Sequence, residues 1–232
     1  MTSRSDRGPP ASRVITSLTN DRVKLIRSLD MRKARRETGL FVAEGASVLM
    51  TARENGWRPQ ILAHGAEARE SRAHRELIDW ALREGTEGLE VSHAVLEKLA
   101  AKENPQNLMG VFEQRWAALP ETKTLAQSAL WVALDEIRDP GNLGTIIRTV
   151  DAVGADGVIL VGNCCDPYQR EAVRATMGSL FAVPLVKVER AAFVHWAKTW
   201  PGDRIGTHLD ATADFRDGGY KGPTLLLMGR EG

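Results

Sequence analysis

Residues 130–161 read LWVALDEIRDPGNLGTIIRTVDAVGADGVILV, and this stretch predicts the fold. It opens with a compact apolar run at Leu130–Leu134, typical of a strand buried on both faces of a parallel sheet. A polar, Gly-containing loop follows, and Asn142 can cap a predicted helix that continues to Val153. Gly157–Val161 is again short and apolar. The order strand, helix, strand indicates a βαβ unit and therefore an α/β domain with a parallel sheet.

The same alternation continues toward the C-terminal end of the sequence. The predicted helices are Gln169–Ser179 and Ala191–Trp200, and the predicted strands are Ala182–Val186, Arg204–Thr207 and Thr224–Met228.

The N-terminal half has its own alternation of strands and helices, which predicts a second, smaller α/β domain. The predicted strands are Leu40–Ala43, Gln60–Ala63, Leu89–Val91 and Leu108–Phe112, and the helices after the first are Ala46–Glu54, Arg69–Arg83 and Ser92–Ala101. We expect a flexible polar tail over 1–13, the first domain over 14–115, a linker over 116–128 and the second domain over 129–232.

Composition narrows the class of protein. With 43% hydrophobic residues the chain is globular rather than disordered. The tail lacks the apolar stretch of a signal peptide, and no window approaches the roughly 18 apolar residues of a membrane span. The two cysteines, Cys164 and Cys165, are adjacent, which suits neither an ordinary disulfide nor a metal site. We therefore expect a cytoplasmic protein without a membrane span. The histidines show no metal-ligand spacing, so we expect them on surfaces and expect no metal.

Positive charge is concentrated in the first predicted helical region, although the formal net charge is only +1. Residues 21–36 include seven basic residues and only two acidic ones. The basic residues are Arg22, Lys24, Arg27, Arg32, Lys33, Arg35 and Arg36, and the acidic ones are Asp21 and Asp30. Local clusters of this kind bind phosphates, so we expect Arg22, Arg32, Lys33, Arg35 and Arg36 to contact a nucleic acid.

The loop DPGNLGTIIR at 139–148 joins a buried strand to a helix. In open α/β sheets ligands bind where such loops meet helix N-termini, so we expect this loop in a pocket. A purely structural turn is the alternative. The sequence has neither a GxxxxGK[ST] nor a GxGxxG pattern here, which disfavours a nucleotide-binding α/β enzyme.

Five blocks resemble the SpoU/TrmH family of SPOUT methyltransferases. They are Asp139–Arg148, Gly154–Leu160, Asp166–Tyr168, Val173–Phe181 and Leu226–Gly232, in family order. More weakly, the basic first helix, Gly39–Gly45 and Asn104–Gln106 resemble the family's ribosomal-protein-like N-terminal domain, which binds RNA.

The resemblance implies S-adenosylmethionine-dependent methylation of a ribose 2′-hydroxyl in a structured RNA, ribosomal or transfer. It also implies a SPOUT α/β domain with a trefoil knot and a homodimer with the active site near the subunit interface. A non-catalytic RNA-binding protein with a degenerate second domain is the alternative. The family continues into a third motif that this sequence does not include, so we expect the native protein to continue for a few tens of residues.

Residue roles follow from the resemblance. The catalytic candidates are Arg148, Asn142 and Glu231; the cofactor contacts are Thr207, His208, Leu209, Met228 and Gly229; and further RNA contacts are Arg174 and Ser179. Asn142 would orient Arg148 or the ribose, or act only as a cap. Gly144 would let the backbone approach the substrate. Because a guanidinium has a pKa above about 12, we expect Arg148 to stabilise an alkoxide rather than to act as a base.

Overall fold

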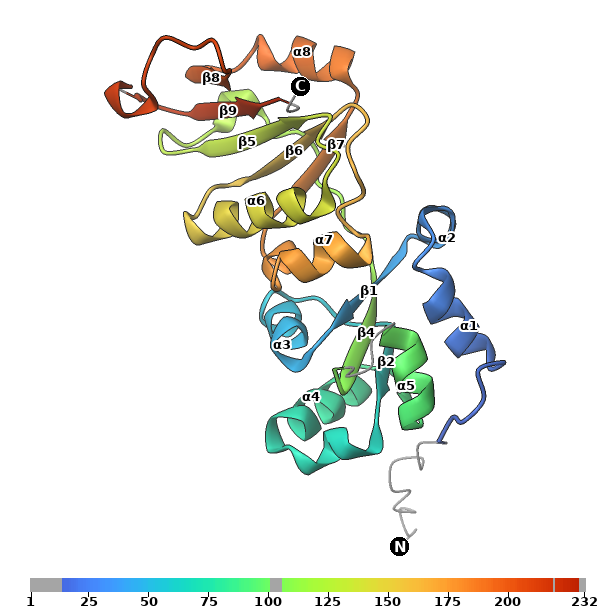
Figure 1. Cartoon of the computed structure of the whole chain (residues 1–232). Helices are drawn as coiled ribbons and strands as arrows, with labels where there is room; N and C mark the ends of the chain where they lie inside the picture. Colours follow the sequence, from blue (N-terminus) through green and yellow to red (C-terminus); the bar gives the residue numbers. More distant parts are fainter. Residues whose placement is uncertain (1–13, 101–105, 219, 230–232) are drawn as a thin grey trace, which may run out of the picture.

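The computed structural model describes residues 14–100, 106–218 and 220–229, and it contains two sheets (Figure 1). The N-terminal sheet has the strand order β1-β4-β2-β3, with β1 and β2 antiparallel to β4 and β3 parallel to β2. Its strands are β1 (Leu40–Glu44), β2 (Ile61–His64), β3 (Glu87–Glu90) and β4 (Leu108–Glu113). The helices of this half are α1 (Asp21–Ser28), α2 (Arg32–Thr38), α3 (Ala46–Glu54), α4 (Arg72–Arg83) and α5 (His93–Ala100).

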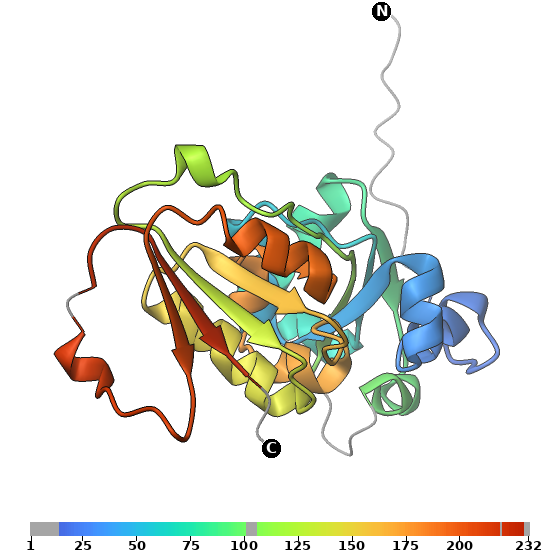
Figure 2. The ribbon, with the colours of Figure 1, turned by 90° about the horizontal axis from the view of Figure 1, so that it is seen from above.

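The C-terminal sheet is parallel throughout and has the order β7-β6-β5-β9-β8. Its strands are β5 (Leu130–Asp135), β6 (Gly157–Val161), β7 (Leu185–Val188), β8 (Asp203–Thr207) and β9 (Thr224–Met228). Helices α6 (Pro140–Ala152) and α7 (Arg170–Ala175) cover one face, and α8 (Arg190–Ala197) covers the other (Figures 1 and 2). The expected α/β fold with a parallel sheet is confirmed.

Alternating side chains of the parallel strands enter two separate cores. Val132 and Leu134 of β5 pack with Ile147 of α6, whereas Trp131 and Ala133 pack with Phe193 of α8. Because both faces are covered at the centre of the sheet, β6 is apolar throughout and β5 is apolar up to Leu134, whereas the edge strand β8 contains Asp203 and Arg204.

The two halves share one hydrophobic core. The rings of Phe41 and Tyr168 lie with centroids 4.8 Å apart, and those of Phe112 and Phe181 lie 4.9 Å apart. The indole of Trp57 donates a hydrogen bond to the carbonyl of Phe181 at 2.9 Å. The N-terminal sheet is therefore seated firmly against the α7 side of the C-terminal half.

The segment expected as a linker, 116–128, packs along the C-terminal sheet. The amide of Ala117 donates to the carbonyl of Leu185 at 2.8 Å, and the indole of Trp196 donates to the carbonyl of Pro120 at 3.0 Å. These contacts tie the connection to the second half of the chain.

Several local expectations differ from the structure; for example, the helix predicted at Ala191–Trp200 ends at Ala197. The predicted helix Gln169–Ser179 ends at Ala175, because Met177 and Gly178 adopt left-handed backbone with φ of 52° and 105°. The strand predicted at Ala182–Val186 begins only at Leu185. His64, expected on a surface, is 1% exposed inside β2.

Candidate active site

The DPGNLGTIIR loop begins α6 through a cap that the sequence interpretation placed three residues too late. The side chain of Asp139, not that of Asn142, caps the helix by accepting the amide of Asn142 at 2.6 Å. Pro140 occupies the first turn, where a missing N–H costs nothing. The amide side chain of Asn142 is thereby left free of the capping role and is exposed.

A cavity of about 690 Å³ lies beside this helix start. Its lining includes Leu134 at the end of β5, Ile137 and Asn142 from the loop and α6, and Met228 and Gly229 at the end of β9. The strand order reverses between β5 and β9, and ligands of open α/β sheets bind at such switch points. The expectation that the loop lies in a pocket is confirmed.

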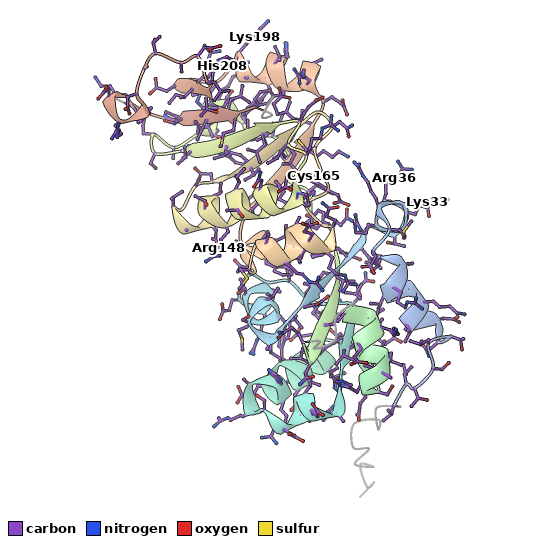
Figure 3. All side chains as sticks on the ribbon, in the orientation of Figure 1. Lys33, Arg36, Arg148, Cys165, Lys198 and His208 are labelled. Atoms are coloured by element: carbon purple, nitrogen blue, oxygen red, sulfur yellow. The ribbon has the colours of Figure 1, made fainter. Side chains whose placement is uncertain are left out.

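The predicted cofactor residues divide into two groups. Met228 and Gly229 line the cavity, and Thr207 pairs with Met228 in the β8–β9 register, one strand away. His208 (Figure 3) instead forms an exposed pair with Asp210, and Leu209 is fully exposed in the loop after β8. The structure therefore brings Asn142, Met228 and Gly229 together, but it does not bring His208 and Leu209 to the cavity.

Arg148 lies on α6, six residues after Asn142. At about 100° per residue the two side chains point about 120° apart around the helix, and Arg148 is not among the residues that line the cavity. Arg148 is exposed and projects from α6 away from the five-stranded sheet (Figure 3). Within the described part of the chain, no hydrogen bond or ion pair engages its guanidinium. Glu231 lies outside the described residues.

Arg138 is a wall residue of the cavity that the sequence interpretation missed. It forms an ion pair with Glu136 at 3.3 Å. Glu136 has a φ of 56°, an uncommon conformation for a residue with a side chain, and its amide donates to the carbonyl of Val161 at 3.1 Å. This strained turn redirects the chain from β5 into the loop. Arg138 directly precedes the loop at 139–148, and this adjacency is the sequence feature that could have identified it as a cavity residue.

Gly144 has a different role from the one expected. A Cβ at this position would lie 2.5 Å from the Cβ of Ala175 and 2.6 Å from the carbonyl oxygen of Ala172. The glycine therefore permits close packing of α6 on α7, and the expectation that it approaches substrate is corrected.

The basic cluster of α1 and α2 is only partly available to a ligand. Arg32, Lys33 and Arg36 are exposed on α2, with Lys33 3.9 Å from Glu37. Arg22 is paired with Glu87 at 2.9 Å.

Arg35 is buried to 2% exposure and cannot contact phosphate in this structure. Its Nε donates to Asp166 at 2.8 Å, and its Nη1 donates to the carbonyls of Leu29 and Asp30. The assignment of Arg35 to RNA is corrected to a structural ion pair, because its guanidinium is buried and already bound to a carboxylate and two carbonyls.

Arg174 and Ser179 also lie at the contact between the halves. Arg174 donates to both carboxylate oxygens of Glu44 at 3.0 Å and to the carbonyl of Ala100 at 2.9 Å. Ser179 is 9% exposed. Their places favour a role in joining the halves over a role in binding RNA.

Comparison with known proteins gives the class of the chain. The SpoU rRNA Methylase family matches residues 129–232, and the MRM3-like substrate binding domain matches residues 20–110. A 23S rRNA uridine 2′-O-methyltransferase of Streptomyces viridochromogenes is 32% identical over 96% of this chain and 78% of its own length. The RlmP 23S rRNA guanosine 2′-O-methyltransferase of Bacillus subtilis is 29% identical over 94% of this chain and 82% of its own length.

Solved structures agree. The AdoMet-bound rRNA methyltransferase from Sinorhizobium meliloti has a TM-score of 0.82 and 38% identity, covering 95% of this chain and 82% of that one. The AdoMet complex of the SpoU methyltransferase AviRb from Streptomyces viridochromogenes has a TM-score of 0.79 and 32% identity, covering 91% and 82%. This chain belongs to the SpoU rRNA methylase family.

Across 14–100, 106–218 and 220–229, no helix has both the length and the apolar composition required to span a bilayer. Over the same ranges, no group of three or more His, Cys, Asp and Glu side chains is placed to hold a metal ion.

Proposed function

We propose that this protein transfers a methyl group from S-adenosylmethionine to a ribose 2′-hydroxyl of ribosomal RNA. One observation carries the proposal: the helix start of the DPGNLGTIIR loop and the end of β9 at Met228 and Gly229 line one cavity at the switch point of a parallel sheet. The named activities of the rRNA methyltransferase relatives and the two AdoMet-bound neighbours support it.

The cavity suits S-adenosylmethionine in size and chemistry. A volume of about 690 Å³ falls within the range of small-ligand sites. Leu134, Ile137 and Met228 offer apolar surface for the adenosine, and Asn142 and Asp139 offer polar groups for the ribose and the amino-acid end. A Cβ on Gly229 would meet nothing within 4 Å, so the backbone there is open to a ligand. When bound, this cofactor supplies the methyl group.

Arg148 then acts on the ribose hydroxyl. A guanidinium beside the ribose would stabilise the negative charge that develops on the 2′-oxygen while its proton passes to water, and its planar fork would also hold the neighbouring phosphate. The free state of Arg148 in this chain suits such a role, because no partner among the described residues has to be displaced.

A homodimer would complete this site. Arg148 and Asn142 face different directions on α6, so one chain does not bring both to the same cavity. A second copy packed on α6 would place its Arg148 near the Asn142 cavity of the first. We include the trefoil knot of SPOUT domains in the same proposal, on the support of family membership.

The N-terminal domain, over 14–115, would hold the RNA through the exposed α2 cations Arg32, Lys33 and Arg36. This domain would have a ribosomal-protein-like fold, and the methyltransferase domain would cover 129–232; the two family matches support that division. We also propose a cytoplasmic location, where ribosomal RNA of bacterial relatives is made.

Titration calorimetry tests the cofactor part of the proposal. S-adenosylmethionine should bind one site per chain, and Asn142→Ala should weaken binding or transfer. A matched variant on the same helix, Thr149→Ala, lies outside the cavity and should behave as wild type. An S-adenosylmethionine affinity and a transfer rate that are both unchanged in Asn142→Ala would mean that the cofactor binds elsewhere.

A further inference from the structure

A second cavity, of about 590 Å³, lies between the two halves of the protein. Here α2 faces the loop that follows β6 and the end of β7. We call it the interdomain cleft. The residues that matter to its chemistry are Arg32, Arg36, Trp116, Asn163, Cys165 and Lys187. Figure 3 labels Arg36 and Cys165 on its two sides.

The cleft carries an excess of positive charge. Arg32 and Arg36 approach from α2 and Lys187 from β7, and all three are exposed without an ion pair to any described residue. Of the two acids on the wall, Asp166 is already neutralised by Arg35, which leaves Glu189. Burial raises the pKa of the Cys165 thiol to about 11, so this side chain adds no negative charge at neutral pH. An anionic ligand is therefore favoured.

Trp116 gives the cleft an aromatic surface. Its side chain is among the exposed large hydrophobics, at 40% exposure. Its ring packs edge-on against Tyr168, with centroids 5.2 Å apart and planes at 85°. Tyr168 is itself fixed, because its hydroxyl donates to the carbonyl of Arg115 and accepts the amide of Arg115. An indole that is fixed by packing and still partly exposed to solvent is suited to stacking on a planar base.

The cleft and the candidate active site share a wall. Cys165 lines the cleft and Ile137 lines the active-site cavity, and the amide of Cys165 donates to the carbonyl of Ile137 at 2.8 Å. Both cavities open at the carboxyl ends of neighbouring strands of one sheet, which lie about 5 Å apart. An extended RNA segment that leaves the active site on the side of Cys165 would therefore pass into the cleft.

We infer that the interdomain cleft binds a single-stranded nucleotide next to the methylated one, with its base stacked on Trp116 and its phosphate held by Arg32, Arg36 and Lys187. The inference rests on the proposed function and deepens it. It adds two contacts from outside the basic helices, Trp116 and Lys187, and predicts that the target lies in an unpaired RNA segment.

Fluorescence anisotropy with a labelled ten-nucleotide oligouridylate tests the cleft directly. Trp116→Ala should weaken binding about tenfold, the size of a lost base–aromatic stack, and Trp116→Phe should restore most of it. Lys187→Gln should lower the slope of log affinity against log salt by about 0.7, the value for one phosphate contact on a single strand. Lys198→Gln removes the same charge from an exposed position directly after α8 and should leave the slope unchanged. Equal slopes for the two lysine variants, or wild-type affinity in Trp116→Ala, would overturn the inference.

Methyl transfer to 23S rRNA separates this inference from the proposed function. If the wild-type protein transfers methyl groups, Trp116→Ala should raise the KM for RNA about tenfold, with S-adenosylmethionine affinity unchanged. An unchanged KM would reject the cleft and leave the proposed function standing. If the wild-type protein transfers none, the proposed function fails, and the oligouridylate titration still decides whether the cleft binds RNA.

Discussion

Arg35 and Asp166 form an ion pair at 2.8 Å although 131 residues separate them in sequence. Their side chains are 3% and 14% exposed. The second carboxylate oxygen of Asp166 accepts the amide of Tyr168, and the guanidinium also binds two carbonyls of the α1–α2 turn. The pair therefore joins α2 to the loop before α7 and holds the two halves of the protein in one arrangement.

Removing the cation should destabilise the protein strongly. Arg35→Met leaves Asp166 buried without its counterion, which costs about 3 kcal/mol in comparable pairs. Urea denaturation measures the free energy of unfolding. Lys33→Met, which breaks the exposed contact with Glu37, should stay within about 0.5 kcal/mol of wild type. A similar decrease in the free energy of unfolding in the two variants would mean that the buried Arg35 pair stabilises the protein no more than an exposed one.

A methyl group at Gly144 should separate α6 from α7. Gly144→Ala places a Cβ against backbone and side-chain atoms of α7 at 2.5–2.6 Å, and overpacking of this kind typically costs about 1–3 kcal/mol. Thermal unfolding should show a lower Tm. Gly206→Ala, where an added Cβ meets nothing within 4 Å, is the matched control. Tolerance of both substitutions would show that the helices can move apart at little cost.

Arg148→Ala should stop methyl transfer and leave folding and RNA binding nearly intact, because the side chain is exposed and forms no hydrogen bond or ion pair with any described residue. Arg148→Lys should recover little, since an ammonium lacks the planar fork. Single-turnover transfer of labelled methyl groups measures the effect, with the exposed Arg83→Ala of α4 as control. Wild-type turnover by the alanine variant would remove Arg148 from the mechanism.

Stability should decrease as the pH falls through the range in which histidine titrates. Burial lowers the pKa of His64 below its ordinary value of 6.5, so the folded imidazole stays neutral while the unfolded one takes up a proton. Below pH 6.5 the unfolded state binds more protons, and the free energy of unfolding falls by at most about 1.4 kcal/mol per pH unit until the folded pKa is reached.

His64→Gln should flatten this dependence between pH 5.5 and 7.5, and His195→Gln, exposed on α8, should not. Urea denaturation at each pH gives the comparison. A slope that survives in His64→Gln would assign the effect to another group.

Local sequence patterns predicted the elements well where the pattern and the packing agree. The bounds of α3, β6 and β9 match the structure to the residue, because an apolar run between glycines or a short amphipathic segment leaves few alternatives. The helix at Gln169–Ser179 failed because the left-handed backbone at Met177 is not encoded by hydrophobic periodicity.

Local sequence patterns could not predict contacts between residues that are far apart in the chain. Arg35 and Arg174 look like surface charges because their partners, Asp166 and Glu44, are 131 and 130 residues away. Gly144 looked like a substrate-approach position because α7, which requires it, is not visible from the loop motif. The position of the loop at 139–148 between a buried strand and a helix predicted the pocket beside Asn142, whereas the roles of the individual residues came from family resemblance.

Transfer to RNA is the most direct test of the central claim. The protein as its gene encodes it is incubated with methyl-labelled S-adenosylmethionine and 23S rRNA from a strain that lacks the gene, and the RNA is digested and analysed by mass spectrometry. We expect one nucleotide to carry the label on its ribose 2′-oxygen, in an unpaired segment. No transfer, or label on a base, would contradict the assignment.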